Sequence, residues 1–213
     1  MKNSFIVALL MLSSSIIYPQ VELRGGMGID FASIPSLQDY INQLLGTELL
    51  GSMNSAVVFS GEAGYLLNEN YSFGIDAGYL INSYTSVYDL GQFEFAYNIL
   101  ALSVMNYYVV SGEGYHFKFG GGIGPRFVFI DESLPGTGST ITYKSTGFGF
   151  ILRADGNTSL GGKVFANIGA DIKYDFNGEP SDNGRYLVNT VIPENVSMDS
   201  FSFGLRLGLS YLF

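Results

Sequence analysis

Few side chains in this sequence are suited to catalysis, because the 213 residues include one histidine, His116, and no cysteine. A histidine beside a serine and an acid could act as the general base in acyl transfer. His116 directly follows the turn from Gly112 to Gly114, however, far from the long loops described below. Without cysteine, disulfides and thiolate metal sites are excluded. We therefore predict no catalytic residue, no metal site and no cofactor.

Charged residues recur at alternate positions, on the side opposite to bulky apolar residues. Inside a narrow barrel such charges form a network of salt bridges and hydrogen bonds, whereas in a pore they line a conducting path. The sequence contains eight such alternating segments, and a barrel of eight strands leaves little room for a path, so we predict an interior network. Its predicted members are Arg24, Asp30, Glu62, Asp76, Glu94, Lys118, Arg126, Arg153, Asp171, Lys173 and Arg206.

The segments that carry these charges are predicted to be β-strands, because large apolar residues alternate with small or polar ones. The number of segments is even, which lets an antiparallel up-and-down barrel close with both termini at one end. Pro125 falls on an outward face of the fifth strand, where we expect a local bulge. The predicted strands cover residues 21–32, 55–67, 71–83, 93–110, 115–130, 140–155, 164–174 and 198–213.

The composition favours a barrel that spans a membrane. Only 14% of the residues are charged, although 47% are hydrophobic, and a soluble protein needs more charge on its surface. The predicted strands exceed the usual soluble strand in length and match a tilted membrane crossing. Tyrosines near strand ends would form the aromatic girdles of such a barrel. These are Tyr65, Tyr71, Tyr107, Tyr115, Tyr174 and Tyr211.

The connections between strands alternate between short turns and long loops, as in outer-membrane barrels. The first long loop has an amphipathic pattern that predicts a short helix, with Ser36 as its cap and Gly46 at its end. We interpret this helix as a plug on the barrel mouth; the alternatives are a helix on lipid headgroups or one that receives a partner. Its apolar face comprises Leu37, Tyr40, Ile41, Leu44 and Leu45.

Acids predominate in the long loops, where we expect solvated carboxylates rather than a metal site. The formal net charge of −9 also argues against nucleic acid as a partner. The loop charges are Asp39, Glu48, Asp89, Asp131, Glu132, Glu179, Asp182, Glu194 and Asp199, against Arg185.

Residues 1–20 have the pattern of a secretory signal peptide, with Lys2 before an apolar stretch and small residues after it. Residues 21–213 would then form a single domain. Over that range the chain resembles the small outer-membrane β-barrel domain family, which includes PorT-like proteins and, more distantly, the OmpA and OmpX transmembrane domains. The stretches that carry the resemblance are Gly25 to Gly28, Pro35 to Tyr40, Phe117 to Pro125, and Leu209 to Phe213.

The resemblance implies a location in the bacterial outer membrane, with both chain ends of the barrel in the periplasm and lipid around the barrel. It also implies that the barrel-assembly machinery recognises the closing strand as its signal. The family has no shared catalytic residues that could be transferred to this chain. In contrast to OmpA-like proteins, we expect no periplasmic peptidoglycan-binding domain beside the predicted barrel. The residues of the implied signal are Leu205, Leu207, Leu209, Tyr211 and Phe213.

We expect a monomeric, non-enzymatic barrel with a structural, surface-interaction or secretion-accessory role, whose partner would be an extracellular or envelope protein. Three alternatives stay open. The first is a small passive channel, and the second is a lipid-modifying enzyme that uses His116. The third is a soluble β-sandwich or lipocalin-like binding protein, in which the apolar side of each strand points inward.

Overall fold

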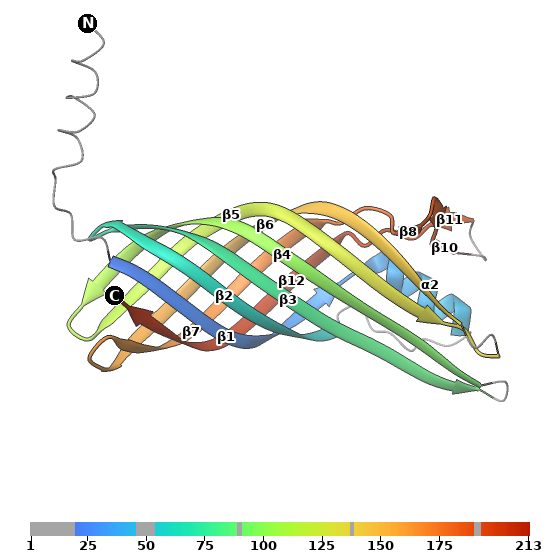
Figure 1. The fold of residues 1–213 in the computed structure, drawn as a ribbon, viewed down its shortest axis with the longest axis horizontal. Helices are drawn as coiled ribbons and strands as arrows, with labels where there is room; N and C mark the ends of the chain where they lie inside the picture. Colours follow the sequence, from blue (N-terminus) through green and yellow to red (C-terminus); the bar gives the residue numbers. More distant parts are fainter. Residues whose placement is uncertain (1–19, 46–53, 89–90, 137–138, 190–192) are drawn as a thin grey trace, which may run out of the picture.

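Eight long strands close into a ring in the computed structural model, which describes residues 20–45, 54–88, 91–136, 139–189 and 193–213 (Figure 1). Neighbouring strands are antiparallel and follow the order β5-β4-β3-β2-β1-β12-β7-β6, and β5 also pairs with β6. The predicted eight-stranded up-and-down barrel is therefore confirmed. The strands are β1 (Gln20–Ser33), β2 (Asn54–Asn68), β3 (Tyr71–Tyr88), β4 (Gly91–Gly112), β5 (Tyr115–Ser133), β6 (Thr140–Gly161), β7 (Val164–Phe176) and β12 (Ser200–Leu212).

The two ends of the barrel differ. The tight turns β2–β3, β4–β5 and β6–β7 lie at one end together with Phe213, and we call this the turn end (Figure 1). The opposite end, the loop end, carries a helix and four strands of two residues each. These elements are α2 (Pro35–Leu45), β8 (Ser181–Asp182), β9 (Arg185–Tyr186), β10 (Val188–Asn189) and β11 (Glu194–Asn195). The predicted signal peptide lies outside the described residues apart from Gln20, which begins β1.

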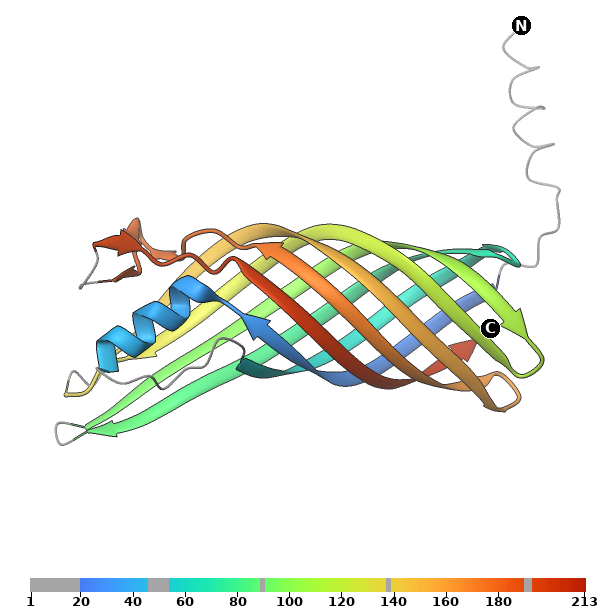
Figure 2. The same ribbon diagram turned by 180° about the vertical axis from the view of Figure 1, so that it is seen from behind.

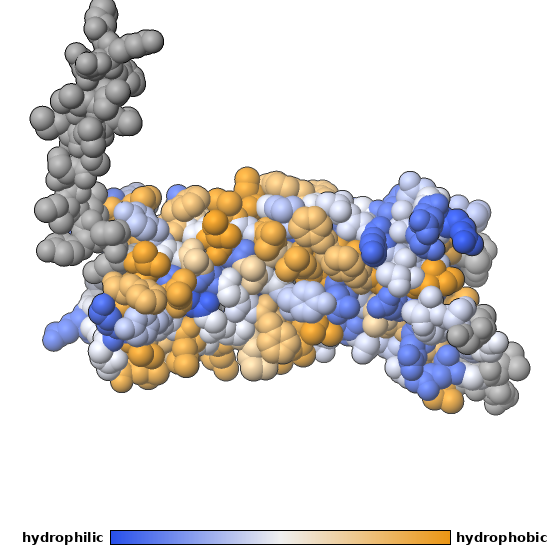
Figure 3. Space-filling view, in the orientation of Figure 1, coloured by the Kyte–Doolittle hydropathy of each residue, from blue (hydrophilic) through white to orange (hydrophobic). Residues whose placement is uncertain are grey.

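Outward side chains form an apolar belt. On β12, for example, every second residue from Phe201 to Phe213 points outward, and the side chain of Leu207 is 63% exposed. Aromatic residues lie at both edges of the belt, with Tyr71, Tyr115 and Tyr211 toward the turn end. Figure 3 shows apolar side chains along the barrel body and hydrophilic ones at the loop end. This inside-out arrangement contradicts a soluble sandwich or lipocalin-like barrel, whose apolar residues face inward.

Four strands continue beyond the others at the loop end (Figures 1 and 2). The strands β4 and β6 have 22 residues each, whereas β12 has 13. We call the extended part the wall, which comprises residues 82–88 of β3, 91–99 of β4, 130–133 of β5 and 140–147 of β6. The sequence-based strand limits were too short here, and part of what we predicted as long loops is regular sheet.

The helix α2 packs on the inner face of the wall. Its residues Leu37, Tyr40 and Ile41 are buried, whereas Leu44 is 38% exposed and the side chain of Leu45 is outside the described set. The predicted cap is wrong: α2 begins with Pro35, and the hydroxyl of Ser36 instead accepts a hydrogen bond from the backbone N–H of Ser197 at 3.0 Å. The predicted helix end, Gly46, lies outside the described residues. Proline suits the first helical position because that N–H has no helical partner.

The bulge predicted at Pro125 does not occur. The register of β4 with β5 is the same on both sides, with Ala101 opposite Arg126 and Val104 opposite Ile123. Proline has no N–H to donate to the ladder. The carbonyl of Leu102 instead accepts a hydrogen bond from Arg126 Nη1 at 2.9 Å, so the proline is accommodated within a continuous sheet.

Candidate functional site

The barrel interior is filled by charged side chains that converge on Arg153 of β6. Arg153 is 5% exposed, and its Nη1 lies 2.8 Å from Asp76 Oδ1 and 3.1 Å from Glu62 Oε2. Its Nη2 adds a second contact to Asp76 at 3.3 Å, so this pair is bidentate. Asp171 lies 3.6 Å from Arg153 Nε and also pairs with Arg206. One arginine therefore connects acids from three strands, β2, β3 and β7.

A second group lies nearer the turn end. Glu22 pairs with Lys118 and with Arg24, and Arg24 Nη1 lies 2.5 Å from Asp155 Oδ2. Tyr107 donates a hydrogen bond to Glu62 Oε2 at 2.6 Å and lies within cation–π distance of Lys118 Nζ, at 5.6 Å from its ring centroid. The tyrosine thereby links this group to the Arg153 group.

A third group lies toward the loop end. Lys173 pairs with Asp30 and lies 3.5 Å from Asp171, and Arg126 Nε donates to Asp175 Oδ1 at 2.7 Å. Glycine makes room for the second pair, because a Cβ at Gly149 would collide with both Asp175 and Arg126. The glycines on inward faces thus let charged side chains from neighbouring strands occupy a narrow interior.

Ten of the eleven predicted network residues lie inside the barrel; Glu94 does not. On β4 the odd-numbered residues face inward, so Glu94 is exposed on the outer face of the wall, where Gln92 donates to it at 2.7 Å. The same parity corrects Tyr107, which we predicted at the outer girdle and which is fully buried inside. Both errors arise because β4 is bulky on both faces, which hides the alternation.

Glu22, Asp155 and Asp175 also belong to the network and were not predicted from the sequence. All three occupy inward positions of their strands, so strand parity alone could have identified them. With them, six interior bases face seven interior acids. Because burial of an unpaired charge is costly, this near balance is what allows so many charges inside.

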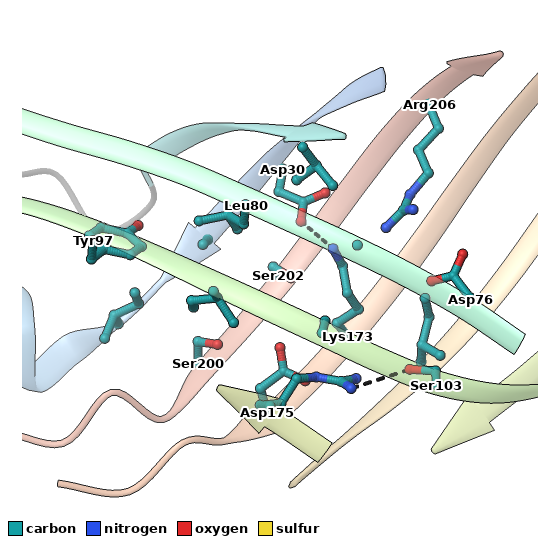
Figure 4. Close-up of a pocket in the computed structure, with 18 residues that line it drawn as sticks. Asp30, Asp76, Leu80, Tyr97, Ser103, Lys173, Asp175, Ser200, Ser202 and Arg206 are labelled. Atoms are coloured by element: carbon teal, nitrogen blue, oxygen red, sulfur yellow. Dashed lines mark hydrogen bonds and ion pairs between the residues drawn. The ribbon is translucent and has the colours of Figure 1, made fainter. Parts of the chain in front are cut away.

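Two small cavities lie along the interior. The larger, of about 30 Å³, is lined by Asp30, Asp76, Lys173 and Arg206 among others (Figure 4). The smaller, of about 10 Å³, lies at the Arg153 group. Asp76 and Arg206 line both cavities. The described interior is therefore a packed network that leaves only little space at these two places.

We predict ordered water in the larger cavity. Among the described residues, Arg206 Nη1 and Asp30 Oδ1 are buried without a hydrogen-bond partner, and both residues line that cavity. Its volume suffices for one or two water molecules, which bind where several polar groups converge. A crystal structure at about 2 Å resolution or better should show density within hydrogen-bond distance of both atoms. A dry cavity at that resolution would contradict this prediction.

An apolar layer closes the interior at the loop end. Ile34, which directly precedes α2, and Leu37 and Ile41 on the helix belong to one buried cluster with residues of the wall. Residues that precede β12 complete the layer. The other members are Tyr40, Phe93, Phe95, Tyr97, Ile99, Val128, Ile130, Tyr143, Leu187, Val196 and Met198.

One carboxylate lies within this apolar layer. Glu132 of β5 is 2% exposed and accepts a hydrogen bond from the hydroxyl of Tyr40. Its neighbours across the sheet are Phe95 on β4 and Ile141 on β6. Burial raises the pKa of Glu132, although hydrogen bonds from Tyr40 and Tyr143 oppose that rise. The prediction of a solvated loop carboxylate is wrong for Glu132, because Ser133 extends β5 and the inward parity continues to this position.

His116 lies at the turn end, where its ring contacts Phe165 with a centroid separation of 5.1 Å. No ion pair or side-chain hydrogen bond of its imidazole occurs within the described ranges. In the same ranges no group of three or more histidines or acids is arranged to hold a metal ion. No described helix is long and apolar enough to span a membrane.

Comparison with solved structures places the fold. Over about nine-tenths of this chain, it superposes on Ail of Yersinia pestis with a TM-score of 0.56, at 11% identity and 99% coverage of that chain. A major outer membrane protein of Thermus thermophilus gives a TM-score of 0.52 at 16% identity, covering 91% of this chain and 99% of that one. Neisserial surface protein A gives 0.50 at 15% identity, with 91% and 97% covered.

No protein-family model matches the chain, and no curated protein sequence matches it significantly. The similarity therefore extends to the fold and not to any one sequence family. Together with the closed ring, the outward apolar belt and the charged interior, it shows that this chain has the fold of the small outer-membrane β-barrels.

Proposed function

We propose that the protein is a non-enzymatic integral outer-membrane barrel whose role is structural or is exerted at its loop end, toward a surface or secretion partner. The observation that carries this proposal is the interior: buried ion pairs occupy the barrel along its length, and an apolar layer covers its loop end. Such an interior fills a narrow barrel and leaves no wide path for a solute.

The outward surface supports a location in a membrane. On β12, Phe201 and Tyr211 are ten residues apart, and the side chains between them that point outward are apolar. A tilted strand of about 9–11 residues spans the hydrocarbon layer. Aromatic residues at both edges would lie at the lipid headgroups. We therefore propose outer-membrane lipid as the surroundings of the belt, with the turn end in the periplasm.

Two kinds of protein partner are consistent with the geometry. The alternating face of β12, ending at Phe213, presents the pattern that we propose the barrel-assembly machinery binds during biogenesis. At the loop end, the wall carries Asp131 and Glu94 on its exposed outer face, with Lys144 beside them. An extracellular or envelope protein that contacts this polar surface is the proposed partner of the mature barrel.

An anionic polysaccharide is a poor candidate for that partner. Ail was solved in complex with a heparin analogue. In this chain, the exposed acids of the described loop end outnumber the exposed bases and would repel a polyanion. The acids are Asp39, Glu94, Asp131, Glu179 and Glu194, and the bases are Lys144 and Arg185.

Conductance tests the proposal against a channel. Full-length mature protein reconstituted into a planar lipid bilayer should show no discrete current steps, because the Arg153 group fills the interior. A general porin reconstituted in parallel serves as the positive control. Reproducible steps from the purified monomer would overturn the closed-barrel proposal.

A lipid analysis tests the proposal against an enzyme. Cells that produce the wild-type protein and cells that produce His116→Ala should have the same envelope lipids. Equal amounts of folded barrel in the two strains serve as the control. A modification that depends on the protein and disappears with His116→Ala would restore the lipid-modifying alternative.

A further inference from the structure

The buried acid Glu132 connects the helix α2 to the wall. Its carboxylate accepts a hydrogen bond from the hydroxyl of Tyr40, which lies on the buried face of α2. Tyr143 on the wall belongs to the same buried cluster and, like Tyr40, opposes the rise in the pKa of this acid. A single acidic side chain therefore lies at the contact between the plug helix and the sheet that holds it.

Among the described residues, Glu132 has no cationic partner in direct contact. In the described ranges no lysine, arginine or histidine forms an ion pair with it, although all the acids of the interior network have such partners. The other charged groups nearby, Asp182 of β8 and Arg185 of β9, act on Tyr143. The neighbours across the sheet, Phe95 and Ile141, are apolar.

Ionisation of Glu132 opposes docking of the helix. A carboxylate without a cation is poorly solvated in an apolar layer, whereas the neutral acid is accommodated there. If α2 moves away, Glu132 faces water at the barrel mouth and ionises freely. The docked state therefore binds the proton more tightly than the released state does.

We propose that α2 is a pH-sensitive plug, which is held over the barrel mouth while Glu132 is protonated and is released when this residue ionises. Release uncovers Phe93, Phe95 and Tyr97 on the inner face of the wall. The arrangement therefore controls access to an apolar surface at the loop end, in addition to any contact made by the outer face.

The direction of the pH dependence follows from linkage. Burial raises the pKa of Glu132 in the docked state. The stabilisation of the docked helix is therefore complete below the ordinary pKa of glutamate and is lost as pH rises through the raised value. Tyr40 and Tyr143 do not ionise in the range in which Glu132 does, because burial and the neighbouring Glu132 raise the pKa of both phenols.

Thiol labelling of the full-length barrel in detergent or lipid vesicles tests the plug, since the natural chain has no cysteine. The reporter variant is Leu37→Cys, because Leu37 on α2 is 2% exposed. A second variant, Val87→Cys, corrects for the change of thiol reactivity with pH, because Val87 on the wall is 78% exposed. From about pH 5 to about pH 9, the corrected labelling rate of the reporter should rise, by at most about tenfold per pH unit because one proton is linked.

Two matched variants identify the responsible group. With Glu132→Gln, which keeps the shape and cannot ionise, Leu37→Cys should stay protected throughout the pH range. Met105→Cys, buried inside the barrel, should stay protected as well and so distinguishes helix release from unfolding. If Leu37→Cys does not fold, Ile41→Cys replaces it.

Three results would overturn the plug. The reporter could be protected at every pH, or it could react fully at every pH. It could also show the same pH dependence with Glu132→Gln as without it.

Discussion

Replacing Arg153 by alanine should lower the free energy of unfolding by about 3–5 kcal/mol, the range for breaking a buried ion pair from one side. The substitution leaves Asp76 without its bidentate partner and removes an ion pair from Glu62 and from Asp171. All three acids are almost inaccessible to water. Urea titrations of the folded barrel in lipid vesicles would measure this loss of unfolding free energy. Unfolding can be followed by gel mobility or by tyrosine fluorescence, because the chain has no tryptophan.

Two variants make this result specific to the network. Arg185→Ala removes an exposed arginine at the loop end and should change the free energy of unfolding by less than about 0.5 kcal/mol. Adding Asp76→Asn to Arg153→Ala should recover part of the loss, because one unpaired acid becomes neutral. A cost below about 1 kcal/mol for Arg153→Ala would mean that the interior is hydrated enough to screen its charges, which would favour a channel.

The strand pattern was predictable because a barrel surrounded by lipid imposes a strict period of two. On β12 each outward residue is bulky and apolar, while the inward positions alternate between Gly204, Arg206 and Gly208. The parity of each strand then placed most charges correctly.

The wall and the plug were not predictable by the same rule. Beyond the belt, the inner face of β4 packs against α2, so Phe93, Phe95 and Tyr97 are apolar where an inward position within the belt would be polar or small. The pattern of β4 therefore changes along its length. For this reason Glu94 was assigned to the wrong face. Glu132 was predicted to be a solvated loop residue because the continuation of β5 to Ser133 was not recognised.

The partners within the network also needed the structure. Lys173 pairs with Asp30, which is 143 positions away in the sequence, because β12 lies between their strands in the ring. Parity gives the face of a residue but not its height in the barrel. Only the register, for example Asp30 opposite Gly204 and Lys173 opposite Ser202, sets the two side chains side by side.

An arginine on the belt should be as damaging as a lost network residue. Leu207 lies near the middle of β12, opposite Met27 and Ile168, and its side chain is 63% exposed. In lipid this exposed face meets hydrocarbon, so Leu207→Arg should lower the free energy of unfolding by about 2–4 kcal/mol. The measurement is urea unfolding in vesicles of a phospholipid with a defined chain length.

Val87→Arg provides the matched control. Val87 is 78% exposed on β3, but it lies in the wall beyond the aromatic edge of the belt, where an arginine would be in water. Its substitution should change the free energy of unfolding by less than about 0.5 kcal/mol. The two sites are both outward and both exposed, so burial cannot explain a difference between them. Equal costs at both sites would show that no hydrocarbon layer surrounds the belt, and a difference of several kcal/mol locates the membrane on this barrel.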